Sequence, residues 1–214
     1  MITIKTFTFG PFQENTVILH DPSNQCVIID PGCYTTAEQQ MLKKYIEEKK
    51  LKPVLLLNTH CHVDHVAGNR FVYDTYGLLP IIHKEDLIVL QSQERVCQMY
   101  RLNCDPSPMP EKFIEEGDTV KFGNTELQVL FTPGHAPGHV VFHNKENKFV
   151  INGDVLFNGS IGRTDLPLGD FDTLENSIRT KLYTLPDETV VYCGHGPTTT
   201  IGQEKKSNPF VNEG

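Results

Sequence analysis

Four potential metal ligands, His60, His62, Asp64 and His65, lie within six residues of one another. They follow a short apolar segment, residues 53–57, of the kind that forms a strand covered on both faces. Residues two apart do not share a helix face, so a loop is the natural way to bring His60 and His62 to one ion. Asp64 and His65 then face a neighbouring ion. A lone histidine is usually structural, but this mixture of imidazole and carboxylate predicts a site for zinc, or for iron or manganese.

Three further candidates each follow an expected strand and have a glycine beside them: His135, Asp154 and His195. A glycine lets the backbone approach a bound ion closely, and the end of a strand holds a ligand rigidly. Any one of the three could be a polar strand cap, but that interpretation is poor for all of them together. His139 is as good a candidate for packing, or for orienting a ligand, as for binding metal itself.

The complete pattern resembles the ligand set of the metallo-β-lactamase superfamily, in the same order along nearly the whole chain. Within that superfamily, residues 153–157, 159–167 and 194–202 resemble the glyoxalase II-like hydrolases. The resemblance implies a first ion held by His60, His62 and His135. It implies a second ion held by Asp64, His65 and His195, with Asp154 bridging the two. Two divalent metal ions are therefore expected, and zinc is the first choice.

The same resemblance implies an α+β fold, the four-layer αββα sandwich of the metallo-β-lactamase superfamily. The order of expected elements suits two sheets packed together with helices outside. Strands are expected at residues 2–9, 15–20, 26–30, 53–57, 79–83, 119–122, 126–131, 140–143, 149–152 and 189–192. Helices are expected after a cap at Thr35, at residues 66–76 and 84–102, and after a cap at Asp172. Neither side of the proline-rich stretch near Pro108 carries a complete set of site residues, so a single metallo-hydrolase domain over residues 1–214 is expected.

Two neighbouring cations favour hydrolysis, because they lower the pKa of a shared water from about 15.7 to about 7. The expected reaction is attack by a metal-bridging hydroxide on a thioester or related ester. Asp64 is the candidate catalytic residue, since it would orient the hydroxide as well as bind metal. Arg163 is the candidate for binding a substrate carboxylate, and a salt bridge with Asp165 is its alternative role.

Two other functions stay open at this point. A persulfide dioxygenase with a single iron is similar in the His60 motif and in residues 162–165, whereas residues 194–197 resemble the hydrolases. A non-catalytic metal-binding protein is the third possibility, although no ligand position is missing. Nineteen residues follow His195. The helical carboxy-terminal extension with which glyoxalase II enzymes help to hold glutathione is therefore expected to be missing.

Composition limits which binding partners and which cellular compartment are expected. The formal net charge of −8 argues against a nucleic-acid partner. No apolar run approaches the roughly 20 residues that cross a bilayer, so no membrane partner is expected. The six cysteines form no C-x-x-C pair, and Cys61 is expected to point away from the ligands because its neighbours alternate toward the metal. We therefore expect a reduced, cytoplasmic protein that acts on a small molecule; the sequence leaves its oligomeric state open.

Overall fold

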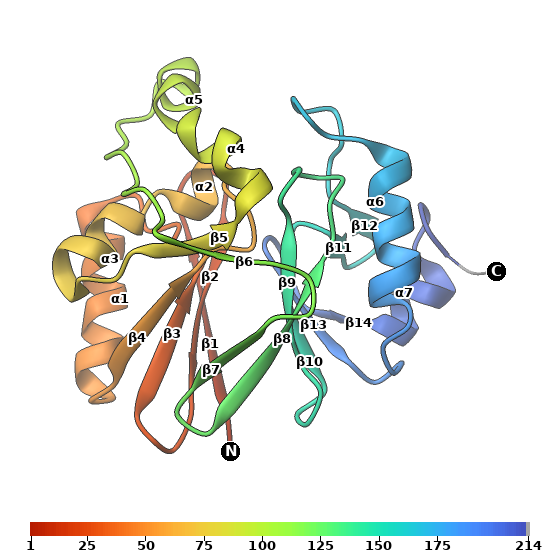
Figure 1. Ribbon diagram of the computed structural model, residues 1–214, viewed down its shortest axis with the longest axis horizontal. Coiled ribbons are helices and arrows are strands. Elements are labelled where there is room, and N and C mark those ends of the chain that lie inside the picture. The colour runs from red at the N-terminus through yellow and green to blue at the C-terminus, as the bar shows by residue number, and fades with distance from the viewer. Residues whose placement is uncertain (213–214) are drawn as a thin grey trace. The chain divides into compact units, whose positions relative to one another are not determined.

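The computed structural model describes residues 1–212, which divide into two compact units. The first unit comprises residues 1–114 with 121–126, and the second comprises residues 115–120 with residues 127 onward. Each unit is built on a six-stranded sheet with helices packed against it (Figure 1). The single metallo-hydrolase domain over residues 1–214 stays a prediction. Among the described residues, every helix is too short or too polar to cross a membrane.

The first sheet has the strand order β1-β2-β3-β4-β5-β6. Its strands are β1 (Thr3–Phe9), β2 (Glu14–His20), β3 (Gln25–Ile29), β4 (Lys52–Leu57), β5 (Pro80–His83) and β6 (Lys112–Ile114). The first three pair antiparallel, and β3 to β6 pair parallel. Parallel neighbours need crossover connections, which helices provide here. These are α1 (Thr36–Glu48), α2 (Val63–Val66), α3 (Asn69–Tyr76), the 3₁₀ turn η1 (Lys84–Asp86), α4 (Leu87–Gln91) and α5 (Gln93–Tyr100).

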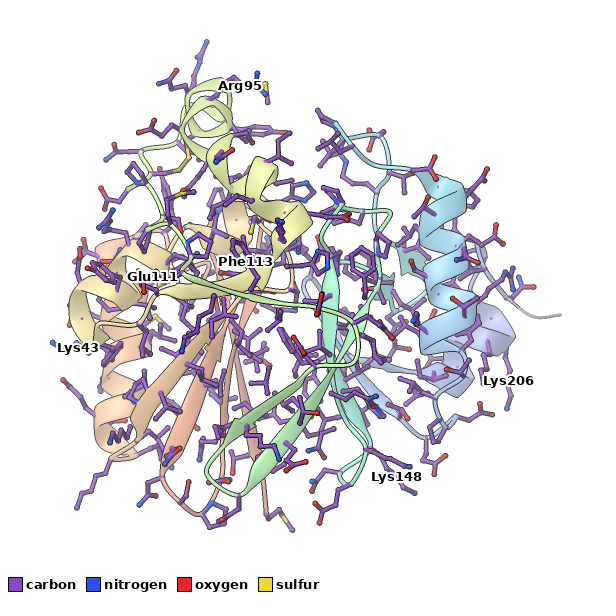
Figure 2. All side chains as sticks on the ribbon, in the orientation of Figure 1. Lys43, Arg95, Glu111, Phe113, Lys148 and Lys206 are labelled. Carbon is purple, nitrogen blue, oxygen red and sulfur yellow. A yellow bond between two sulfur atoms is a disulfide. The ribbon has the colours of Figure 1, made fainter. Side chains whose placement is uncertain are left out.

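Helix α1 shows how the sequence builds the first unit. Its predicted cap is confirmed: the Thr35 side chain accepts the backbone N–H of Glu38, whose carboxylate accepts the backbone N–H of Thr35. One face of α1 buries Leu42 and Ile46, whereas Lys43 on another face reaches solvent (Figure 2). Full burial of such an aliphatic side chain contributes about 1.5–3 kcal/mol. The helix therefore packs on the apolar core that the sheet presents.

The second sheet has the strand order β14-β13-β10-β9-β8-β7. Its strands are β7 (Thr119–Phe122), β8 (Thr125–Phe131), β9 (Val140–Asn144), β10 (Phe149–Gly153), β13 (Val190–Cys193) and β14 (Thr199–Thr200). Strands β10 and β13 are parallel, and the pairs β8–β9, β9–β10 and β13–β14 are antiparallel. A small hairpin joins β11 (Leu156–Phe157) to β12 (Ser160–Ile161). The helices are α6 (Phe171–Ser177), the π-helix η2 (Ile178–Leu182) and α7 (Ile201–Ser207).

The structure corrects two of the expected helices. The single helix over residues 84–102 is wrong, because a 3₁₀ turn precedes α4 and the chain breaks again at Ser92 before α5. The cap at Asp172 is also wrong. Asp170 caps α6 instead, its carboxylate accepting the backbone N–H of Thr173 at 2.8 Å, and Asp172 lies in the first turn.

The expectation of six reduced cysteines is wrong for one pair. Cys97 in α5 is bonded to Cys104, with their Cα atoms 6.2 Å apart. The other four cysteines are buried thiols. Burial raises the pKa of Cys26 and Cys193 to about 12, so these thiols stay protonated and behave as small apolar side chains.

Candidate metal centre

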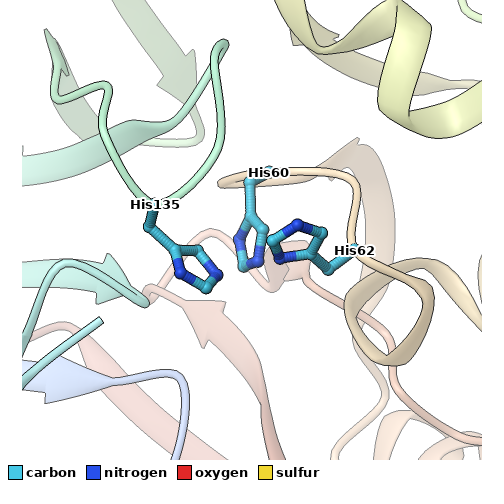
Figure 3. Close-up of side chains that lie close together, drawn as sticks. All are labelled: His60, His62 and His135. Carbon is cyan, nitrogen blue, oxygen red and sulfur yellow. The ribbon is translucent and has the colours of Figure 1, made fainter. Parts of the chain in front are cut away.

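The loop that follows β4 carries four of the predicted ligands. His60 and His62 project from this loop with their rings side by side, edge to face, at 4.8 Å between centroids (Figure 3). His62 precedes α2, and Asp64 and His65 lie within its single turn. The ring of His65 lies 4.0 Å from that of His60. The structure thus brings together the four residues of this motif, and His60 and His65 are fully buried.

A carboxylate that sequence reasoning missed, Asp30, fixes two of these imidazoles. Asp30 follows β3, the parallel neighbour of β4, and accepts the backbone N–H and the hydroxyl of Thr59 at 2.7 and 2.5 Å. It also accepts from Nδ1 of His65 at 3.1 Å. Because the Thr59 hydroxyl donates to Asp30, its oxygen accepts from Nδ1 of His60, 3.1 Å away. Both rings therefore carry their proton on Nδ1 and present the lone pair of Nε2, the arrangement found in metal-binding histidines.

The backbone of the loop is held from both sides. The carboxylate of Asp86 accepts the backbone N–H of Cys61, and the side-chain amide of Asn58 donates to the carbonyl of His65 at 2.9 Å. Cys61 packs in a small apolar cluster with Val66, so its side chain points away from the ligands as predicted. Burial raises the pKa of the Cys61 thiol well above its ordinary value. The loop is thereby fixed independently of its ligand side chains.

The other three predicted ligands converge in the second unit. His135 follows β8, Asp154 follows β10 and His195 follows β13; Figure 3 shows His135 at its loop. Oδ2 of Asp154 lies 3.5 Å from Nε2 of His135 and 3.4 Å from Nε2 of His195. Nδ1 of His135 donates to the carbonyl of Arg163 at 2.7 Å, which fixes the lone pair on Nε2. One carboxylate oxygen therefore lies within reach of two imidazole nitrogens.

His139 holds the backbone of Asp154 in place. Its Nε2 accepts the backbone N–H of Asp154 at 3.1 Å, and its Nδ1 faces the hydroxyl of Thr132 at 3.3 Å. The side chain is completely buried. Both ring nitrogens thus have protein partners, so His139 orients the backbone of Asp154.

Comparison with known proteins places this arrangement in a family. The profile of the metallo-beta-lactamase superfamily matches residues 9–195. The chain belongs to the metallo-β-lactamase superfamily. It is 40% identical over 213 residues to "Hydroxyacylglutathione hydrolase GloC" of Haemophilus influenzae, covering 99% of each chain. The resemblance to the glyoxalase II-like branch is thereby confirmed.

Two solved structures of the superfamily confirm the predicted fold. The structure of the BLEG-1 B3 metallo-beta-lactamase matches with a TM-score of 0.89 and 33% identity, over 98% of this chain and 99% of that one. The structure of TTHA1623 in a di-iron-bound form matches with a TM-score of 0.87 and 38% identity, over 97% and 100%. The chain therefore has the metallo-β-lactamase fold, a fold that binds divalent metals.

The donor set of the second unit fits this superfamily's metals. In a tetrahedral site with bonds of about 2.0–2.2 Å, two ligand atoms lie roughly 3.4 Å apart. The two distances from Asp154 Oδ2, 3.5 and 3.4 Å, match that spacing. The donor atoms of Asp154, His135 and His195 are therefore spaced as ligands of bound metal would be.

The segment after Asp154 is also built for close packing. A Cβ added at Gly162 would lie 1.9 Å from the carbonyl oxygen of Asp154, so only glycine fits there. The next residue, Arg163, forms a two-pronged ion pair with Asp165 at 2.7 and 2.8 Å, and both side chains are mostly exposed. These hydrogen bonds lower the pKa of Asp165 to about 2. The alternative role considered for Arg163, a salt bridge, is therefore present, and its binding of a substrate carboxylate stays a prediction.

Proposed function

We propose that this protein is a binuclear metal-dependent hydrolase that cleaves a thioester or related ester of small size. The observation that carries the proposal is the position of Asp154 Oδ2, 3.4–3.5 Å from the Nε2 atoms of two histidines. The name of the GloC relative supports thioester hydrolysis as the reaction. Because the proposed ligands come from both units, the proposal requires the two units to act as one metallo-hydrolase domain.

In the proposed centre, each ion would take three ligands of its own, and the carboxylate of Asp154 would serve both. The first ion would be held by His60, His62 and His135. The second ion would be held by Asp64, His65 and His195. When bound, two divalent ions lower the pKa of water and polarise the carbonyl oxygen that is attacked. Zinc suits these donors, and iron or manganese suits them as well.

The protein's own residues prepare that chemistry. Asp30 and the Arg163 carbonyl hold protons on the Nδ1 atoms of His65 and His135, so the Nε2 lone pairs are directed to metal. Asp64 keeps 18% of its side chain exposed. We infer that its carboxylate accepts a hydrogen bond from the attacking water and takes up its proton. Asp64 is our candidate for the general base, in addition to its role as a ligand.

The test combines metal analysis with a panel of substrates. The purified chain should contain close to two divalent ions and should hydrolyse thioesters, with glutathione thioesters as the first set. Asp154→Asn should remove hydrolysis and release metal, while the exposed control Lys206→Gln keeps both. Full turnover by a folded Asp154→Asn variant without metal would contradict the proposal.

A second candidate is an iron-dependent oxidoreductase of the persulfide dioxygenase type, which would use a single iron. The relative TTHA1623, 38% identical, is solved in a di-iron-bound form, which supports iron as the metal but not the single-iron site. Oxygen uptake with glutathione persulfide, measured on the iron-loaded and the zinc-loaded chain, separates the two candidates. Oxygen uptake without thioester hydrolysis in either form would replace the hydrolase by the oxidoreductase.

A further inference from the structure

A disulfide fixes the segment that connects α5 to β6 in the first unit. This segment, residues 101–111, is called the strap below, and its course can be followed in Figure 1. Cys104 of the strap is bonded to Cys97 of α5. Because a covalent link between two positions removes conformational freedom from the chain around them, the disulfide restricts where the strap can lie.

The strap and α5 contact the loops that surround the ligand motif. The backbone N–H of Asn103 donates to the hydroxyl of Tyr34, in the loop after β3, at 2.7 Å. At the end of α5, the ring of Tyr100 packs edge to face on Phe12, in the turn between β1 and β2, with 5.4 Å between ring centroids. Helix α5 also packs against α2, which carries two of the proposed ligands. A change in the strap is therefore felt by the elements that position the ligands.

A line of hydrogen bonds, the relay, joins the strap to the backbone of His65. The hydroxyl of Ser107 in the strap accepts from the side-chain amide of Asn69 at 2.9 Å. The same amide nitrogen donates to the side-chain oxygen of Asn58 at 3.1 Å. The amide nitrogen of Asn58 donates to the carbonyl of His65 at 2.9 Å. Both asparagines are completely buried, and Ser107 is 8% exposed.

Each member of the relay depends on its neighbour. The amide of Asn58 also donates to the side-chain oxygen of Asn69 at 3.4 Å, so both protons on each amide nitrogen are used. In a buried network, losing one partner leaves an unpaired polar group, which is unfavourable. The backbone N–H of Ser107 donates to Oε1 of Gln93 in α5 at 2.7 Å. The position of the strap on α5 therefore determines how rigidly the carbonyl of His65 is held.

The disulfide can exchange with small thiols at Cys104. This residue is partly exposed, whereas Cys97 is buried. A small thiolate that attacks Sγ of Cys104 forms a mixed disulfide, and Sγ of Cys97 leaves as a thiolate that takes up a proton. A second small thiolate attacks the sulfur of the first, which releases a small disulfide and the thiol of Cys104. Two small thiols are thereby oxidised while two cysteines are reduced, and a small disulfide reverses the exchange.

We propose that the Cys97–Cys104 pair is a redox switch that sets how firmly His65 is held for metal. In the disulfide form the strap is fixed, the relay is intact and His65 is pre-organised as a ligand. In the dithiol form the strap gains freedom and the bond between Ser107 and Asn69 opens more often. Ordering His65 then weakens metal binding.

The inference rests on the proposed function, in which His65 would hold the second ion. Cleavage of a thioester would itself release a thiol, which is the class of compound that opens this disulfide. Accumulated product would therefore lower the occupancy of the second ion.

The test compares metal affinity in the two redox states of the full chain. The chain is treated with glutathione disulfide or with dithiothreitol, freed of the reagent under argon, and titrated with zinc against a chelator. Thiol counting after unfolding verifies the states, with four thiols in the disulfide form and six in the dithiol form. Reduction should weaken binding of the second zinc ion roughly 2–30-fold, the range of coupling through packed networks.

Three variants separate the switch from a general effect of the reagents. The double variant Cys97→Ser/Cys104→Ser should bind zinc as the reduced chain does and should respond to neither reagent. Ser107→Ala interrupts the relay and keeps the disulfide, so it should weaken zinc binding and remove most of the response to reduction. The matched control is Ser207→Ala, at an exposed serine of α7, which should respond as the wild type does.

The wild-type comparison needs no variant, so it holds even where a variant folds poorly. Equal zinc affinity in the two redox forms overturns the switch and leaves the proposed function standing. A chain that keeps six thiols after glutathione disulfide also overturns the switch. A full response to reduction in Ser107→Ala overturns the relay as its route. Absence of a second ion in both forms contradicts the proposed binuclear centre, and the switch with it.

Discussion

The carboxylate of Asp30 accepts the Nδ1 proton of His65 at 3.1 Å and, through the Thr59 hydroxyl, also sets the tautomer of His60. This relationship follows from strand register. Ile29 of β3 pairs with Leu57 of β4, so the residues that follow these two strands leave the sheet side by side. One buried acid that follows β3 therefore prepares two ligands that follow β4.

Replacing this acid should weaken metal binding without removing a proposed ligand. In Asp30→Asn, the amide nitrogen Nδ2 is a hydrogen-bond donor. It would face either the hydroxyl of Thr59 or Nδ1 of His65, and both of these groups are donors themselves. Loss of such a supporting group typically lowers metal affinity roughly 10–100-fold. Competition with a chelator measures that affinity, and Asp74→Asn, at an exposed ion pair with Arg70, is the control. Equal affinity in Asp30→Asn and the wild type would refute the role of Asp30.

The contact between Gly134 and α6 should make the His135 loop intolerant of any side chain. Gly134 has φ +128°, and a Cβ there would lie 2.3 Å from the backbone nitrogen of Leu174. A strained backbone position costs roughly 1–3 kcal/mol. Gly134→Ala should therefore destabilise the fold by at least that amount. Gly117→Ala is the matched control, because Gly117 also has positive φ (+85°) but has open space around its Cβ position. Urea unfolding of both variants measures the difference, and equal losses would show that the contact with α6 is unimportant.

The predictable part of the site is the part that local sequence encodes. His60 to His65 form one compact motif, and His135, Asp154 and His195 each follow a strand that is apolar enough to be recognised by itself. The capping box of α1 and most strands are confirmed for the same reason. Short elements carry too few residues to show a period, so the sequence does not predict β6, β11, β12, β14 or α7.

The unpredictable part depends on which strands become neighbours. Asp30 directly follows a strand and is itself followed by Pro31 and Gly32, a signal comparable to that of His60. Its partners are set only by the pairing of β3 with β4. The buried carboxylate of Glu204 is a second example. It accepts hydrogen bonds from Thr199, Gly159 and Asn208, at 2.5, 3.0 and 2.8 Å. The residues next to Glu204 in α7 do not indicate that its carboxylate is buried.

The lowered pKa of His143 predicts a pH dependence of stability. Burial holds this pKa below its ordinary value of 6.5, so the unfolded chain binds the proton first as the pH falls. The contribution of His143 to stability is complete above pH 6.5 and is lost as the pH drops through the lower folded value. His143→Gln should therefore flatten the stability profile below pH 6.5. Urea midpoints of both chains across that pH measure it, and parallel profiles would contradict the assignment.

The ion pair between Arg163 and Asp165 predicts how Arg163 acts on substrates, if the proposed hydrolase function holds. An exposed ion pair contributes only about 0–1 kcal/mol, so a substrate carboxylate can compete with Asp165 for the guanidinium. Arg163→Gln should raise KM for thioesters that carry a carboxylate roughly tenfold, with little change in kcat, because a charge-assisted pair is lost. Asp165→Asn should lower the same KM, since it removes the competitor. Thioesters without a carboxylate serve as the control, and their hydrolysis should change in neither variant. A drop in kcat for both substrate classes in Arg163→Gln would contradict this role. It would instead indicate that Arg163 acts by holding His135 through its backbone carbonyl.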